Sequence, residues 1–211
     1  DRITSDSNRN EFPEYLLEKN QQETPANLAL FQSALSNDVP GVHEAISKGG
    51  KVDFFHRKDD SKNALHVSAE GGFAPVVDVL LKHGAHVNAV AVSGHDTALT
   101  LCSHNGHVEV ANKLIESGAD VNIGNGYGNT PLHEACHAGG SLPLLRLLLS
   151  SGANVNAENH KGSTPLHFLC YGSDPRTHSV DMVQELIRAG ADVNRKDHRG
   201  MTAILVWCSS G

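Results

Sequence analysis

The 211-residue chain has few aromatic residues, no excess of positive charge and no long hydrophobic run. Aromatic side chains make up only 5% of the residues, so a core has to be built from leucine, valine, isoleucine and alanine, which suits packed helices. The net charge of −7 argues against a general nucleic-acid binder, which needs a basic face. The longest apolar stretch, 142–149, contains Pro143 and Arg146 and is far shorter than the roughly 20 residues of a membrane span, so we expect no membrane insertion.

Cysteine is also scarce, and its spacing is informative. The four cysteines lie 34, 34 and 38 residues apart, at Cys102, Cys136, Cys170 and Cys208. Two disulfides could in principle form in a secreted protein. A near-constant spacing instead indicates an internal repeat.

Two short motifs recur with the same period. Gly-Ala-x-Val-Asn occurs four times, beginning at Gly84, Gly118, Gly152 and Gly190, with a fainter copy at Gly49. Thr-Pro-Leu-His is complete at Thr130 and Thr164, and partial at Asn63, Thr97 and Thr202. Because the two motifs stay in register, the chain is predicted to be an array of similar units.

Each unit contains two helical patterns. After Thr130 comes a narrow face of small and branched residues, and after the next glycines comes a wider leucine stripe at 144–149. Threonine is a good N-cap, and Pro131 or Pro165 then takes the first helical position. Gly152 lies where a helix C-terminus favours a left-handed residue. Each unit therefore predicts a turn followed by two helices.

These motifs resemble the ankyrin repeat. The resemblance implies an all-α solenoid of stacked helix–turn–helix units with hairpin-like turns, which we place at residues 27–211. We expect a degenerate repeat at 27–57, fuller repeats at 58–90, 91–124, 125–157 and 158–195, and a partial repeat at 196–211. Residues 1–26 are polar and predict a linker with one docked helical turn. The fourth full repeat carries an insertion at 172–179.

The partial repeat leaves the apolar run 204–207 without a second helix to cover it. Terminal repeats usually carry a polar outer face. We therefore expect the chain to be a piece of a longer protein, the alternative being a natural half-repeat that serves as a cap.

A solenoid presents a long concave surface that suits recognition of another protein. We expect a non-catalytic module that binds a protein or peptide there; the alternative is a regulatory or targeting segment of a larger enzyme or channel that contacts its own chain. The resemblance implies contacts from the turns and the first helices, at Asp96, His104, Asn105, Tyr127, Asn129, His137, His160, Lys161, Ser163, Tyr171, His198 and Arg199. The central hypothesis is a groove centred on Tyr127, His137, His160 and Tyr171.

Metal binding and catalysis are weighed against packing. His133, Cys136 and His137 have a spacing that zinc ligands could use. The resemblance instead implies that His66, His133 and His167 bond to the backbone, while Cys136, Cys170 and Cys208 fill small buried positions. The sequence contains no glycine-rich phosphate loop and no nucleophile elbow. We therefore expect no metal, no cofactor and no catalytic residue.

Three further expectations concern modification, assembly and location. The resemblance implies that the asparagine of the Val-Asn motif can be a substrate for an asparaginyl hydroxylase, with Asn122 and Asn194 fitting equally well; the alternative is that they only serve the turn. We expect a monomer. Free cysteines at packing positions favour a reducing compartment, so we expect the cytoplasm, with the nucleus left open.

Overall fold

The computed structural model describes residues 23–56, 62–137, 141–171 and 180–209. The expected insertion at 172–179 and residues 1–22 of the expected linker lie outside this part. The first helix of the described part, α2, begins at Pro25, with Thr24 as its N-cap, so it starts inside the segment assigned to the linker. None of the described helices is long and apolar enough to cross a membrane.

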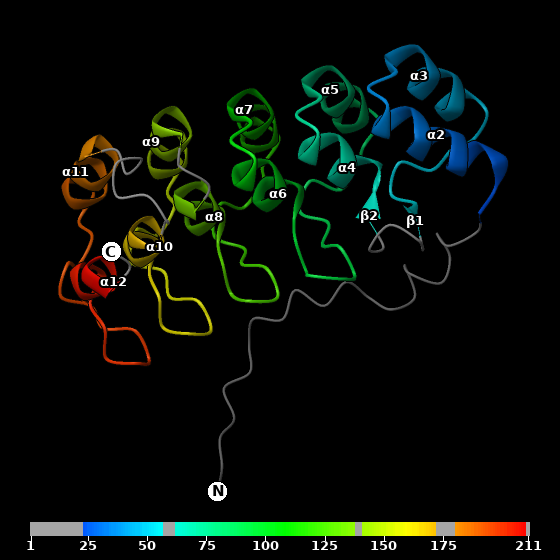
Figure 1. The fold of residues 1–211 in the computed structure, drawn as a ribbon. Coiled ribbons are helices and arrows are strands. Elements are labelled where there is room, and N and C mark those ends of the chain that lie inside the picture. Colours follow the sequence, from blue (N-terminus) through cyan, green and yellow to red (C-terminus); the bar gives the residue numbers. More distant parts are fainter. Residues whose placement is uncertain (1–22, 57–61, 138–140, 172–179, 210–211) are drawn as a thin grey trace, which may run out of the picture.

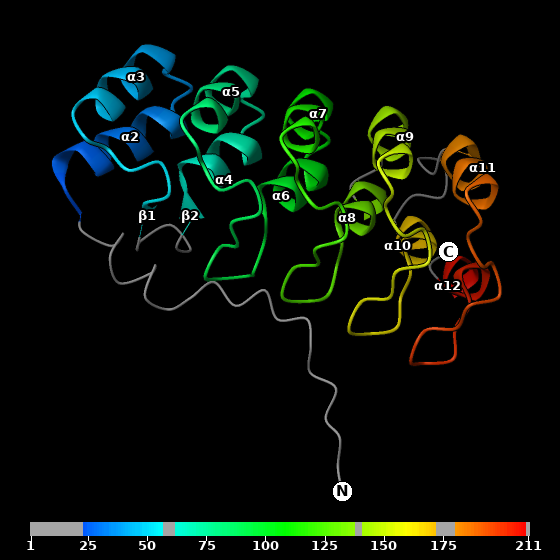
Figure 2. The ribbon, with the colours of Figure 1, turned by 180° about the vertical axis from the view of Figure 1, so that it is seen from behind.

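The helices form two layers, as Figures 1 and 2 show from opposite sides. One layer holds the first helix of each repeat: α2 (Pro25–Leu35), α4 (Ala64–Glu70), α6 (Ala98–His104), α8 (Pro131–His137), α10 (Pro165–Cys170) and α12 (Ala203–Ser209). The other layer holds the second helices: α3 (Val39–Ser47), α5 (Ala74–Lys82), α7 (Val108–Glu116), α9 (Leu142–Ser150) and α11 (Val180–Arg188). The turns that precede the first helices extend away from both layers (Figure 1).

The prediction of an all-α repeat solenoid is confirmed. Within the described ranges the only sheet is the short antiparallel pair β1 (Phe55–His56) and β2 (Lys62–Asn63), which closes the turn before α4. Single antiparallel bridges take its place before α6 and before α12. Each first helix packs on the first helices of the repeats beside it, so the array is built from contacts between neighbours.

Helix boundaries follow the local chemistry of the repeat. Helices α8 and α10 begin at Pro131 and Pro165, as predicted, because the missing proline N–H has no partner at that position in any case. Helix α9 ends at Ser150, and Gly152 follows with φ 90°. A Cβ on Gly152 would meet no atom within 4 Å, so the backbone conformation, and not space, requires glycine there.

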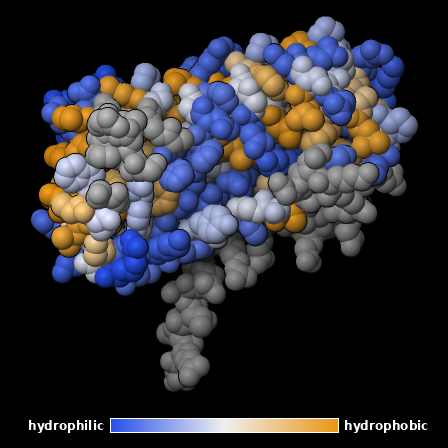
Figure 3. All heavy atoms as spheres, in the orientation of Figure 1, coloured by the Kyte–Doolittle hydropathy of each residue, from blue (hydrophilic) through white to orange (hydrophobic). Residues whose placement is uncertain are grey.

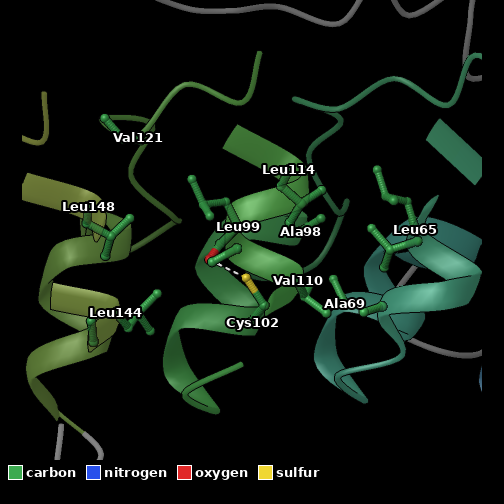
Figure 4. Packing of buried hydrophobic residues seen from close by; sticks show 14 of the residues in the cluster. Leu65, Ala69, Ala98, Leu99, Cys102, Val110, Leu114, Val121, Leu144 and Leu148 are labelled. Carbon is green, nitrogen blue, oxygen red and sulfur yellow. Dashed lines mark hydrogen bonds between the residues drawn. The ribbon is translucent and has the colours of Figure 1, made fainter. Parts of the chain in front are cut away.

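The core is a continuous row of aliphatic side chains between the layers. Figure 4 shows leucines of successive repeats, among them Leu65, Leu99 and Leu148, pointing into the same interior. All three are fully buried. Burying a leucine stabilises the fold by roughly 2 kcal/mol. The leucine stripes of all repeats together therefore supply the hydrophobic driving force for folding in a chain that has few aromatic residues.

The cysteines differ in burial along the array. Cys102 and Cys136 are buried, Cys170 is half-buried and Cys208 is exposed. Burial raises the pKa of the Cys102 thiol to about 12 and also raises that of Cys136. The expectation that Cys208 fills a buried position is wrong, because nothing in the described residues packs on the outer side of α12. For the same reason Trp207 is 48% exposed.

In three of the repeats a buried histidine bonds to the backbone at both of its ring nitrogens. In His133 the Nδ1 atom accepts a hydrogen bond from the Thr130 N–H (3.1 Å), while Nε2 lies 3.0 Å from the carbonyl oxygen of Ser163 in the following turn. His167 makes the equivalent bond to the Met201 oxygen of the following repeat, and His66 Nε2 lies 3.0 Å from the Ala89 oxygen at the end of its own repeat. The role implied by the resemblance is confirmed. Both ring nitrogens are used, so these rings belong to the scaffold.

Neighbouring turns are also joined at their tips. The Gly126 N–H donates to the Gly94 oxygen (2.7 Å), and the His160 N–H donates to the Tyr127 oxygen (3.0 Å). Gly128 sits between the turns with φ 77°, and a Cβ there would lie 2.9 Å from the His160 nitrogen. The turns therefore stack closely enough to form one surface.

A second ladder runs through the Val-Asn motifs. The Asn122 side-chain amide donates to the Gly152 oxygen (3.2 Å), and its Oδ1 accepts from the Asn154 N–H (2.8 Å). The same two bonds recur at the repeats before and after. The Asn194 side chain has no such partner among the described residues, because the described part of the following partial repeat ends with α12 and holds no counterpart of Gly152 and Asn154.

Candidate protein-interaction surface

The first-helix face is the surface formed by the first helices and the turns that precede them. All but one of the predicted contact residues are exposed or half-buried on this face. The exception is Ser163, which is only 1% exposed. Its backbone is held by Asn159 Oδ1 (3.0 Å to the Ser163 nitrogen) and by His133, and its small side chain turns inward. Ser163 is therefore part of the scaffold, and its assignment to the binding surface is wrong.

Five of the predicted residues line a single pocket. This central pocket has a volume of about 300 Å³ and lies between two turns and the helices α6, α8 and α10. The predicted residues that line it are Asp96, His104, Tyr127, Asn129 and His137. Residues that were not predicted complete it: Thr100, Leu101, Asn125, Glu134 and Phe168. Figure 3 shows hydrophilic residues gathered over α6 and α8, in the middle of the face in view.

An aromatic row runs from the pocket toward the C-terminal repeat. The rings of His104 and His137 stack with centroids 5.8 Å apart, and His137 lies 5.9 Å from Phe168. Phe168 in turn meets the edge of Tyr171 at 6.2 Å. Successive first helices therefore place one ring after another along the array.

The four residues of the predicted groove separate into three places. His137 lies in the pocket wall, and Tyr127, 69% exposed, forms its rim. Tyr171 belongs to the aromatic row but does not line the pocket. His160 lies on the turn tip beside Tyr127 and is not a pocket residue.

The remaining predicted residues are turn and helix-end positions with partners of their own. The Asn105 side chain caps α4 through the Glu70 oxygen (3.2 Å). Arg199 pairs with the buried Asp197 (2.9 Å), and its guanidinium lies 5.5 Å from the centre of the Tyr171 ring. Lys161 and His198 are exposed on adjacent turns, which a backbone hydrogen bond joins (2.9 Å).

The floor of the pocket is a polar network around Glu134. Glu134 is only 8% exposed, and its Oε2 lies 2.9 Å from His104 Nδ1. Its Oε1 accepts from the side-chain amides of Asn129 (2.9 Å) and Asn125 (3.3 Å). The Asn125 amide also donates to Asp96 Oδ1 (3.0 Å), so one amide nitrogen bridges two carboxylates.

Burial perturbs one of these carboxyl groups. It raises the pKa of Asp96, the Asn125 hydrogen bond opposes that rise, and the nearby Glu134 charge adds to it. The loss of hydration is therefore the main cause, and the like charge of Glu134 is a smaller one.

Glu134, Leu101 and Phe168 were missed for a common reason. Each lies four residues after the motif threonine or its equivalent, whereas the prediction took the positions seven residues after it. Positions three apart share one side of a helix. That spacing could have identified all three residues. Leu101 and Phe168, however, are apolar, and the sequence alone suggests that they belong to the core.

The predicted zinc spacing can be compared with the part of the chain described. No cluster of three or more His, Cys, Asp or Glu side chains there could hold a metal ion. His133 and Cys136, the strongest zinc candidates, are buried in the packing between repeats.

The chain matches the model of a known protein family. The family model for ankyrin repeats (three copies) matches residues 30–125, 90–160 and 122–197. No curated protein matches the chain significantly. Together the matched segments run from residue 30, inside α2, to residue 197, beyond the end of α11.

Proposed function

The chain belongs to the ankyrin-repeat family, and we propose that it is a non-catalytic module that binds a protein or peptide on its concave, first-helix face. Ankyrin repeats are generally protein–protein interaction modules. The observation that carries the finer proposal is the central pocket, which opens into the aromatic row on that face.

The composition of this surface supports binding over mere solvation. Tyrosine and other rings supply rigid contact area at little entropic cost and are enriched at interface hot spots. The rings of the row are held by neighbours, and Tyr127 and Tyr171 remain exposed. An extended peptide along the row would reach three repeats, and its side chains could enter the pocket.

Selection from a random peptide display library tests this proposal. We expect enriched peptides that bind the purified protein with micromolar affinity. The Tyr127→Ala/Tyr171→Ala variant should lose at least about tenfold in affinity, because interface aromatics commonly contribute more than about 1 kcal/mol each.

The matched control is Ile187→Ala, which removes a similarly exposed apolar side chain (48%) from α11 in the opposite layer. Affinity should be unchanged in this variant. Peptides that bind the tyrosine variant as well as the native chain, or that are lost only with Ile187→Ala, would place recognition on another face and contradict the proposal.

A further inference from the structure

The central pocket contains two acidic side chains and no strong base. Asp96 comes from one turn and Glu134 from the first helix of the next repeat. Neither carboxylate forms an ion pair with a lysine or arginine among the described residues. The basic group beside Glu134 is the imidazole of His104. Elsewhere on the array carboxylates do have such partners, for example Glu70 with Lys62 (2.8 Å).

In the last turn a carboxylate, an arginine and an aromatic ring meet within the chain itself. There Asp197 holds Arg199, whose guanidinium also lies over the Tyr171 ring. Tyr171 occupies the same repeat position as His104 and His137, seven residues after the motif threonine. Arg199 stands three residues before its motif threonine, and the residue at that position in the pocket-forming turn is Tyr127. Asp197 lies five residues before its motif threonine, and that position in the pocket-forming turn is the neutral Asn125, so the carboxylates of the pocket come from other positions of the repeat. The last turn thus carries its own arginine beside the ring, whereas the pocket has two carboxylates and no lysine or arginine in its lining.

The walls suit the rest of a long basic side chain. His104 and His137 stack with their planes 23° apart, and Phe168 and Leu101 continue the wall. Lysine and arginine pack their apolar stems on such surfaces while the charged head reaches a polar group. A cation over an aromatic ring gains further electrostatic attraction. The volume of about 300 Å³ is at the lower end for a ligand pocket and matches one side chain better than a folded partner.

We propose that the central pocket binds a lysine or arginine side chain of the partner peptide. Asp96 and Glu134 accept hydrogen bonds from the cationic head, and His104, His137 and Phe168 hold the stem. This proposal rests on the proposed function, because it states the chemistry of the partner at the same face.

NMR titration of the whole chain with small probes tests the pocket independently of any peptide. The probes are the N-acetyl amides of lysine, arginine, norleucine and glutamate. We expect the two basic probes to shift the backbone amide signals of the pocket residues at millimolar concentration, and norleucine and glutamate to leave those signals unchanged.

Three variants make the test specific. The Asp96→Asn/Glu134→Gln variant keeps the shape of both side chains and should lower the affinity for the basic probes at least tenfold. Glu109→Gln removes one acidic charge from an exposed position on α7, in the other layer, and should leave binding of the probes unchanged. Tyr127→Arg places an arginine at the position that Arg199 occupies in the last turn, and should block the basic probes. Because Tyr127 is exposed, we expect Tyr127→Arg to fold even if Asp96→Asn/Glu134→Gln does not.

The outcomes separate the two proposals. Basic probes that shift nothing in the pocket, norleucine that shifts it equally, or unchanged affinity in Tyr127→Arg would overturn the pocket assignment. Display peptides that need the first-helix face but no basic residue would overturn it too, and would leave the proposed function standing. Basic probes that bind the pocket while no peptide binds the face would sustain the pocket chemistry and count against the proposed function.

Discussion

Acid should weaken the array through His66, whose ring is completely buried between two repeats. Its Nε2 lies 3.0 Å from the Ala89 oxygen, and its Nδ1 accepts from the Asn63 N–H (3.3 Å). Loss of hydration lowers the pKa of His66 to about 4, against partial opposition from backbone oxygens. The Asn63 Oδ1 atom, 2.6 Å from Nδ1, is an acceptor for a protonated ring, but the loss of hydration outweighs it, so the folded chain stays neutral where an unfolded chain is charged.

The sign and size follow from this difference. The unfolded histidine has a pKa of 6.5, so between pH 6.5 and about 4 the unfolded state binds a proton that the folded state does not. The free energy of unfolding should therefore fall as the pH falls through this window and level off below it. At about 1.4 kcal/mol per pKa unit, His66 alone accounts for about 3 kcal/mol. Burial also lowers the pKa of His133, which acts in the same direction.

The next repeat shows which substitutions would remove the buried histidine and keep the helix cap. There Thr97 and Thr100 stand at the positions of Asn63 and His66, and the two threonines cap each other (2.8 and 3.1 Å). Asn63→Thr/His66→Thr installs this neutral pair. Urea unfolding followed by circular dichroism at pH 7 and pH 4.5 should show a loss of stability in the native chain that is about 2–3 kcal/mol larger than in the variant.

An equal loss of stability in the two proteins would refute the reasoning, because the proton uptake would then belong to other groups. The comparison requires a single transition with the same denaturant dependence at both pH values, since repeat arrays can unfold in parts. Less stability at pH 7 in the variant is expected, because it lacks the bond to the Ala89 oxygen.

Two further predictions concern cysteine reactivity and modification. Ellman's reagent on the native protein should label the exposed Cys208 quickly and reach Cys102 and Cys136 only on unfolding, as peptide masses would show; early labelling of either buried thiol would contradict the packing described. If an asparaginyl hydroxylase acts on this chain, Asn194 should gain the oxygen before Asn122, because both the nitrogen and the oxygen of the Asn122 side-chain amide are hydrogen-bonded to the next repeat. Peptide masses would show the order, and equal modification of the two asparagines would show that these hydrogen bonds give no protection.

The periodic features of this protein could be predicted from its sequence alone. A repeat contacts only its neighbours, so the same local rules act every 34 residues or so and leave a visible period. The proline starts at Pro131 and Pro165, the left-handed Gly152 and the backbone role of His133 are all local or nearest-neighbour features.

The tertiary structure decided which side chains share a site. Phe168 resembles a core residue in the sequence, and Ser163 resembles a surface residue, but the packing of successive repeats turns the first toward the pocket and the second inward. The bridge from Asp96 through Asn125 to Glu134 joins residues of two repeats, and no period reveals it. Side-chain direction and the stacking of turns depend on the whole array, which is why the surface was predictable by position and the pocket was not.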